Sequence, residues 1–354
     1  MTKRTRDALR YTEAGAYDDD APTFDFIPGL LHDGTVAFVY GPPGSGKTFF
    51  ILHLLCSTAL GRPVFGVTPE KRRGLYIGLE GDAGIKSRIA AWCDQNGVDE
   101  NPIVYARGPF NLADESGQDV GDLIDYMKKH CIQFVVLDTF AMATAGLDEV
   151  SGAHMTFAMN QLHRIKTETG ACVVAIAHTG KNEKAGIRGH SSLLGNADTT
   201  IELQVHAKDA SAPEDVPVTN ETPRSATVKK QRDGRTGKKL YFGLIDRATP
   251  FRNARGETVT SLAVNENERF TDLGAEQESA RLPAGVDALA LETLEAMRRR
   301  NRRLELPITR DDLRDALKRE GWKRNSKSED AWERGARRLI ASLTQAGLWE
   351  ESFQ

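Results

Sequence analysis

The chain has 354 residues, of which 40% are hydrophobic and 27% are charged, and its formal net charge is −3 at pH 7. This balance is typical of a globular protein in water, and it excludes the strongly basic field that would by itself predict a nucleic-acid partner. No run approaches the roughly 18 to 20 apolar residues of a membrane-spanning helix, and the first residues lack the apolar core of a signal peptide. We therefore predict a cytoplasmic protein with no membrane partner.

The spacing of cysteine and histidine gives no sign of disulfides or of a zinc centre. No two of the four cysteines form a CxxC pair, and the eight histidines show no HxxxH spacing. We therefore expect buried thiols, with metal chemistry confined to the ion that accompanies a nucleotide. The cysteines are Cys56, Cys93, Cys131 and Cys172.

The first three quarters of the chain predict one α/β domain. Residues 1–22 are polar and are predicted to be a disordered lead-in. Residues 23–264 alternate β-branched apolar runs with amphipathic helical patterns, which is typical of a mostly parallel sheet covered on both faces. The first five strands are expected at 35–40, 74–80, 102–106, 132–138 and 171–178, with helices between them.

The pattern changes after residue 198. Strand patterns at 199–205, 225–231 and 238–245 follow one another without helices, which predicts antiparallel C-terminal strands that extend the same sheet. Residues 265–285 are polar and are predicted to be a linker. Residues 286–354 contain three helical patterns and a short terminal strand, and this small helical domain resembles a winged helix.

A glycine-rich loop is the most specific motif in the chain. GPPGSGKT at 41–48 satisfies GxxxxGK[ST] in full, with an apolar strand before it and a helical pattern after it. The glycines let successive backbone N–H groups point at phosphate oxygens, Lys47 is expected to reach the β- and γ-phosphates, and the Thr48 hydroxyl is expected to bind Mg²⁺. The sequence therefore predicts an ATP and Mg²⁺ site that comprises Gly41, Pro42, Pro43, Gly44, Ser45, Gly46, Lys47, Thr48 and Phe49.

Three polar residues close the expected parallel strands. Asp138 ends a strand where its carboxylate can hold Mg²⁺, although such an Asp can also cap the next segment. Glu80 can take a proton from the attacking water or can serve as a helix-cap or turn acid. His178 can contact the γ-phosphate, although a histidine at the end of a strand is more often structural.

The motifs at 41–48, 76–82, 135–141, 173–181 and 228–237 resemble, as an ordered set, the RecA-like ATPase core of hexameric replicative helicases. The resemblance covers about residues 22–250 and is to plasmid RepA-type and phage helicases, with a relation to the DnaB core. It implies a RecA-like P-loop fold and a ring homo-oligomer, a hexamer, with ATP between subunits. It also implies that Glu80 activates water and that His178 senses the γ-phosphate.

The segment KQRDG at 230–234 is similar to the KxRxG element of that family. The resemblance implies that Arg232 is an arginine finger, with Lys230 beside it, and that both reach the γ-phosphate bound by the adjacent subunit. Taken alone, this basic segment is typical of a solvent-exposed turn.

The same resemblance places a DNA-facing loop after His178. The stretch 180–195 is rich in glycine and carries four side chains that can contact the phosphates of single-stranded DNA, and the loop 144–154 is a second candidate. Neither loop has an aromatic stacking residue, and both are equally consistent with ordinary surface loops. The four candidates are Lys181, Lys184, Arg188 and His190.

Two functions remain open at this stage. The ordered motifs favour a plasmid- or phage-type replicative helicase in which ATP hydrolysis drives translocation on single-stranded DNA. The mildly acidic charge and the winged-helix-like tail differ from the replicative type and leave room for an ATP-switched regulator or loader that assembles on DNA or a partner without unwinding. Arginines of the tail can contact duplex DNA or a protein. A monomeric small-molecule kinase is disfavoured by the basic finger element.

Overall fold

The computed structural model describes residues 25–80, 84–114, 116–179, 192–206, 222–232, 234–266, 293–294, 310–319 and 329–345. The chain divides into two compact units, residues 1–271 and 272–354, and each is described by itself. The division falls inside the segment 265–285 that was predicted as a linker, most of which lies outside the described residues.

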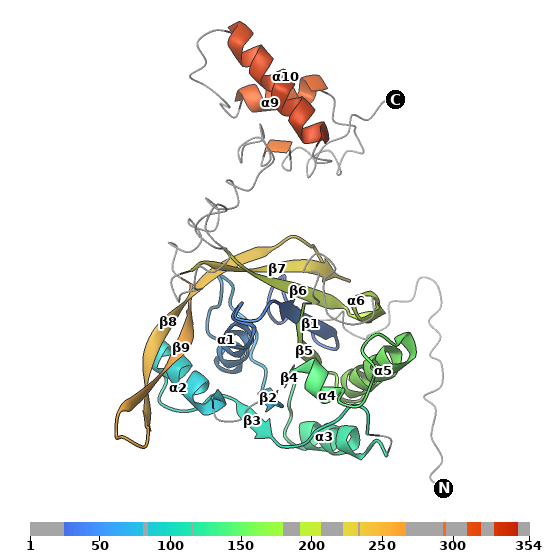
Figure 1. Ribbon diagram of the computed structural model, residues 1–354, viewed down its shortest axis with the longest axis vertical. Helices are drawn as coiled ribbons and strands as arrows, with labels where there is room; N and C mark the ends of the chain where they lie inside the picture. Colours follow the sequence, from blue (N-terminus) through green and yellow to red (C-terminus); the bar gives the residue numbers. More distant parts are fainter. Residues whose placement is uncertain are drawn as a thin grey trace. The chain divides into compact units, whose positions relative to one another are not determined.

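The first unit is built on a nine-stranded sheet in the order β3-β2-β4-β5-β1-β6-β7-β8-β9 (Figure 1). The strands β1 to β6 pair in parallel, whereas β7, β8 and β9 add in antiparallel fashion. This arrangement confirms the predicted RecA-like P-loop fold class with antiparallel C-terminal strands. The strands are β1 (Val36–Gly41), β2 (Gly74–Gly78), β3 (Val104–Arg107), β4 (Phe134–Asp138), β5 (Cys172–His178), β6 (Thr199–Val205), β7 (Arg224–Gln231), β8 (Lys239–Arg252) and β9 (Thr258–Asn265).

Helices cover both faces of the parallel part of the sheet (Figure 1). The helices of this unit are α1 (Lys47–Leu60), α2 (Ile85–Asn96), α3 (Gln118–Lys129), α4 (Phe140–Ala143), α5 (Gly152–Thr169) and α6 (Ser192–Asn196). Successive strand residues point to opposite faces, so β1 supplies Ala37 and Val39 to the core under α1 and α2, and Val36 and Phe38 to the core under α3 to α5. Both faces are buried, which is why these strands lack a polar alternation.

The strand predictions differ from the structure mainly at the C-terminal edge of the sheet. β8 continues to Arg252, beyond the predicted end at 245, and β9 was not predicted at all. β9 alternates exposed and less exposed residues and carries polar Thr258, Thr260 and Ser261, so its sequence is weakly apolar. Pairing with β8 rather than its own composition stabilises it as a strand.

The second unit contains two described helices, α9 (Arg310–Arg319) and α10 (Glu329–Gln345). Leu313 and Leu317 of α9 pack with Trp332 and Leu339 of α10 in one small core. The spacing of these apolar residues is that of one helix face, as the sequence predicted. The first predicted helix of the tail, apart from two residues, and the terminal strand lie outside the described residues, so the winged-helix form stays a prediction.

Within the described part of the chain, no helix is both long enough and apolar enough to cross a membrane.

Candidate functional site

The glycine-rich loop connects the end of β1 to the start of α1. Gly44 and Gly46 have φ angles of +75° and +89°, which L side chains rarely adopt. A Cβ atom on Gly41 would lie 2.5 Å from the carbonyl oxygen of Leu203, so only glycine fits against the neighbouring strand β6. No described side chain caps the N-terminus of α1, and its first turn contains no acidic residue. The first N–H groups of the helix are therefore available to an anion.

Lys47 lies at the start of α1 and is only 7% exposed. Its Nζ donates hydrogen bonds to the carbonyl oxygens of Gly41 and Pro42, each at 2.9 Å, so the side chain folds back over the loop. Burial lowers the pKa of Lys47 from 10.5 to about 8, and the carboxylates of Asp138 and Glu80 oppose that change. The loop thus holds a cation that lacks full compensation for its lost hydration.

Asp138 ends β4 beside the first turn of α1. The hydroxyl of Thr48 donates to Asp138 Oδ2 at 2.8 Å, and the hydroxyl of Tyr76 donates to the same oxygen. Tyr76 is 2% exposed, and its burial, reinforced by the negative charge of Asp138, holds the pKa of its hydroxyl well above the usual value. Two hydroxyl donors therefore orient one carboxylate oxygen of Asp138, while its other oxygen remains for a ligand.

Glu80 was predicted at the end of a strand, but β2 ends two residues earlier at Gly78, and Glu80 lies in the bend that follows. Its Oε1 accepts a hydrogen bond of 2.6 Å from the hydroxyl of Thr139, the residue after Asp138. This contact between the segments that follow β2 and β4 fixes the carboxylate at the same edge of the sheet as the glycine-rich loop.

His178 ends β5 and pairs in register with Gly41, the last residue of β1. The next residue, Thr179, donates its backbone N–H to the carbonyl oxygen of Gly41 at 3.3 Å. His178 is partly buried and lies at the edge of the sheet that carries Asp138 and the loop.

One cavity of about 400 Å³ collects these side chains. The structure thereby brings eight predicted site residues around a single space: Gly44, Gly46, Lys47, Thr48, Phe49, Glu80, Asp138 and His178. The remaining residues that line it are Arg88, Thr139, Ile176, Arg224, Leu244 and Leu262.

Several lining residues were not predicted. Arg88 on α2 places its guanidinium over the ring of Phe49, 5.2 Å from the ring centroid. Arg224 begins β7 and is 3% exposed. Thr139, which lines the cavity, donates to Glu80, and Tyr76, which lies outside the lining, donates to Asp138. The sequence around Tyr76 is that of an ordinary core residue in an apolar strand, and Arg224 follows a polar insert. The neighbouring sequence therefore gave no reason to predict either residue as part of the site. The hydroxyl of Thr139, directly after the Asp138 motif, was the one recognisable clue.

Arg232 and Lys230 do not line this cavity. β7 runs antiparallel to β6. Arg224 therefore lies at the ends of the strands that carry the glycine-rich loop, and Gln231, paired with Thr199, lies at the opposite ends of the strands. Arg224 and Arg232 are eight positions apart, which in an extended chain corresponds to about 26 Å. Arg232 instead forms an ion pair of 2.8 Å with Asp198, and Lys230 Nζ donates to the carbonyl oxygen of Gly195 at 2.7 Å.

The four predicted DNA contacts, Lys181, Lys184, Arg188 and His190, lie outside the described residues. The second candidate loop, between α4 and α5, is described and exposes Val150 and Asp148. The backbone N–H of Asp148 donates to His154 Nδ1 at 2.9 Å, so the one basic side chain of this loop is engaged within it.

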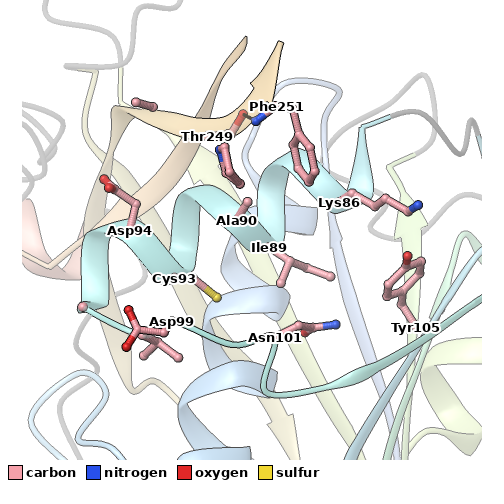
Figure 2. A pocket seen from close by; sticks show the side chains of 14 residues that line it. Lys86, Ile89, Ala90, Cys93, Asp94, Asp99, Asn101, Tyr105, Thr249 and Phe251 are labelled. Carbon is pink, nitrogen blue, oxygen red and sulfur yellow. Dashed lines mark hydrogen bonds between the residues drawn. The ribbon is translucent and has the colours of Figure 1, made fainter. Parts of the chain in front are cut away.

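A larger cavity of about 750 Å³ lies between α2, the start of β3 and the C-terminal part of β8 (Figure 2). Lys86, Cys93, Tyr105 and Phe251 are among its lining residues. Of the described residues that line it, none belongs to the predicted nucleotide site. The smaller cavity is therefore the candidate site, because residues of the glycine-rich loop line it together with Glu80 and Asp138.

The model of a protein family described as an AAA domain matches residues 5–184, which is just over half of the chain. The chain belongs to the AAA domain family. The matched part of this AAA domain protein runs through β5 and includes the glycine-rich loop, Glu80, Asp138 and His178. Family and sheet together make it a RecA-like P-loop ATPase by class.

Two solved structures resemble the AAA domain protein at low similarity. The RadB recombinase is 18% identical with a TM-score of 0.43, and the alignment covers 60% of this chain and 88% of that one. A KaiC-like protein of Pyrococcus horikoshii is 16% identical with a TM-score of 0.44, over 69% of this chain and 100% of that one. Among curated proteins, none matches the sequence.

Proposed function

We propose that this AAA domain protein hydrolyses ATP with Mg²⁺ and that hydrolysis drives its translocation along single-stranded DNA as a ring of identical subunits, a hexamer. One observation carries the proposal: a buried lysine, a threonine paired with an aspartate, and a glutamate held by hydrogen bonding surround one cavity beside the glycine-rich loop. These are the groups that phosphoryl transfer to water requires.

The loop and the start of α1 would bind the polyphosphate. Backbone N–H groups and the positive end of the helix favour an anion, and Lys47 adds a cation that can turn from the carbonyl oxygens of the loop to phosphate oxygens. Phe49 follows within the first turn of the helix.

The donor set beside the loop fits Mg²⁺. Thr48 and Asp138 place a hydroxyl oxygen and a carboxylate oxygen 2.8 Å from each other, and oxygen ligands of this kind suit that ion. Thr48 and Asp138 would hold Mg²⁺, and the bound ion would neutralise charge on the phosphates. The hydrogen bond from Tyr76 keeps the Asp138 carboxylate oriented.

Glu80 is the proposed general base. Its Oε1 accepts from Thr139, which leaves Oε2 to take a proton from water as the water oxygen attacks the γ-phosphorus. The bond from the γ-phosphorus to the bridging oxygen breaks, and ADP leaves with that electron pair. His178, at the end of β5 and next to β4, would contact the γ-phosphate and transmit the loss of that contact to the segment that follows β5.

The position of Arg232 supports a shared site between subunits. About 26 Å of strand separates it from the cavity of its own chain, far more than an arginine side chain spans. We therefore assign Arg232, with Lys230 nearby, to the nucleotide of an adjacent subunit. Reaching that nucleotide requires Arg232 to exchange its partner Asp198 for phosphate.

The proposed DNA contacts are Lys181, Lys184, Arg188 and His190, which follow β5 and its terminal His178 in sequence. The loop between α4 and α5 is a weaker candidate, because Asp148 and Glu149 would repel phosphate. Because this segment directly follows His178, loss of the γ-phosphate contact on hydrolysis would move the side chains that bind DNA.

Steady-state ATPase and strand-separation assays with and without single-stranded DNA test this function. We expect DNA to stimulate hydrolysis and ATP to support unwinding, whereas ATPase indifferent to DNA together with no unwinding would refute the helicase. The second candidate, an ATP-switched regulator or loader, predicts instead ATP-dependent duplex binding that is lost on truncation near residue 285.

A subunit-mixing experiment tests the shared site. Rings of Arg232→Ala subunits lack the finger, and rings of Glu80→Gln subunits lack the base, so each is expected to be inactive. Mixed rings contain some interfaces with an intact base on one side and an intact finger on the other, so part of the ATPase activity should return. Confirmed mixed rings with no recovered activity would contradict the assignment of Arg232 to the neighbouring site.

A further inference from the structure

Arg224 is the one described arginine of the antiparallel strands that lines the candidate site. It begins β7 and is 3% exposed. Its side chain passes directly over the last glycine of the loop, because a Cβ atom built on Gly46 would lie 3.3 Å from Arg224 Cδ and 3.5 Å from Nε. Nη1 donates to the carbonyl oxygen of Thr222 at 2.8 Å, which fixes the direction of the guanidinium.

The position of Arg224 suits it to attract an anionic ligand into the cavity. Gly46 immediately precedes α1, so the guanidinium lies beside the positive end of that helix, and Lys47 lines the same cavity. Burial lowers the pKa of Arg224 to about 10, which still leaves it charged at neutral pH. Two buried cations and a helix N-terminus therefore border one space, and all three would attract a polyphosphate.

The order of the strands places Arg224 on the opposite side of the loop from the acids. Asp138 ends β4 and Glu80 follows β2, whereas β5, β1 and β6 lie between β4 and β7. Four steps of about 4.8 Å separate β4 from β7, or about 19 Å between strand axes. Arg224 therefore approaches Gly46 from the side away from the proposed metal ligands and the attacking water.

We propose that Arg224 acts within its own chain by donating its guanidinium N–H groups to the α- or β-phosphate, the part common to ATP and ADP. The inference rests on the proposed nucleotide site but adds a binding residue to it. It gives the three cations separate tasks: Arg224 secures the nucleoside diphosphate, Lys47 reaches toward the γ-phosphate, and Arg232 serves the neighbouring site.

Direct binding of ADP and of a non-hydrolysable ATP analogue tests the proposal without requiring hydrolysis or DNA. Arg224→Gln is expected to weaken both ligands by a similar factor, about 10- to 100-fold, as expected for the loss of a hydrogen bond to a charged group. Arg224→Lys keeps a cation and should recover part of the affinity. In steady-state assays Arg224→Gln should raise KM for ATP and leave kcat nearly unchanged.

A matched control is Arg72→Gln. Arg72 is also a largely buried arginine of this unit, with 12% side-chain exposure, but it pairs with Asp33 and Glu70 and does not line the cavity. This variant should bind ADP like the unaltered protein. Equal loss of ADP binding in Arg72→Gln and Arg224→Gln would show that the effect is general destabilisation and would overturn the proposal.

Two further outcomes would overturn it. If Arg224→Gln binds both ligands normally, Arg224 is only structural, and if only the ATP analogue is weakened, the contact is to the γ-phosphate. Should Arg224→Gln fail to fold, as judged by thermal unfolding, Arg224→Lys with the affinity of the unaltered protein for both ligands would also reject the proposed donation by the guanidinium N–H groups. Failure of the unaltered protein to bind ADP would reject the nucleotide site itself, whereas binding that Lys47→Ala abolishes but Arg224→Gln leaves intact would reject Arg224 alone.

Discussion

The low pKa of Lys47 predicts that nucleotide affinity depends on pH in the alkaline range. In the free protein, burial lowers this pKa from 10.5 to about 8. A bound polyphosphate stabilises the charged ammonium group and raises the pKa again. Above pH 8 the free protein has lost this proton and the complex has retained it, so binding must take up a proton.

The size of the effect follows from the pKa. A change from 10.5 to about 8 corresponds to about 3 kcal/mol between the charged and neutral forms of Lys47. The affinity for ADP should therefore be nearly constant below about pH 7.5 and should fall about tenfold for each further pH unit above 8, until the pKa of the complex is reached.

Calorimetric titration of ADP at several pH values measures this directly. Repeating each titration in buffers with different heats of ionisation gives the number of protons taken up, which should approach one near pH 9. In Lys47→Arg the cation stays charged throughout, so the variant should show no such fall, whatever its absolute affinity. An affinity of the unaltered protein that is level from pH 7 to 9.5, or an equal slope in Lys47→Arg, would refute the reasoning.

The free energy of unfolding of the nucleotide-free protein should rise with pH in the alkaline range, whereas the affinity for ADP should fall. Because the folded pKa of Lys47 is below the unfolded value of 10.5, the unfolded chain binds more protons between about pH 8 and 10.5. The free energy of unfolding contributed by this group therefore rises with pH across that window, by at most about 3 kcal/mol. Urea unfolding should show this rise, and Lys47→Met should lack it.

Three further substitutions give distinct results. Tyr76→Phe removes the hydroxyl that donates to Asp138 and should lower the free energy of unfolding by about 1.5 to 3 kcal/mol in urea; an unchanged value would mean that the bond contributes nothing. Gly41→Ala would bring a Cβ atom to 2.5 Å from the carbonyl oxygen of Leu203, so the loop must shift, and ADP binding should weaken roughly tenfold or more. Glu80→Gln keeps the shape of the side chain but removes the base, so kcat should fall by about 10²- to 10⁴-fold while the Kd for ADP stays the same; a lowered affinity with normal kcat would exclude Glu80 as the base.

Local pattern was sufficient for most of the first unit. The apolar runs of β1, β4 and β5 and the amphipathic helices between them predicted a parallel sheet covered on both faces, because strands buried on both sides cannot alternate with polar residues. The glycine-rich loop was recognisable because its backbone conformation needs glycine at Gly44 and Gly46. Each of these signals lies within a few neighbouring residues.

The supporting contacts around the site could not be read in this way. The hydroxyl of Tyr76 and the carboxylate of Asp138 are 62 positions apart in sequence, and Thr139 meets Glu80 across 59 positions. Nothing in the residues beside Tyr76 distinguishes it from an ordinary core aromatic. β9 was missed for a related reason, since its strand form depends on pairing with β8.

The sequence by itself determined the class of the fold and was enough to predict the glycine-rich loop, Glu80 and Asp138 as site residues, because these depend on residue type and short spacing. Only the tertiary structure showed that Arg224 lines the candidate site and that Arg232 does not. Arg224 and Arg232 flank the same strand, yet the antiparallel pairing of β7 with β6 places one over the loop and the other at the far edge beside Asp198. Strand direction is set by long-range pairing, so two arginines eight positions apart lie at opposite ends of the strands.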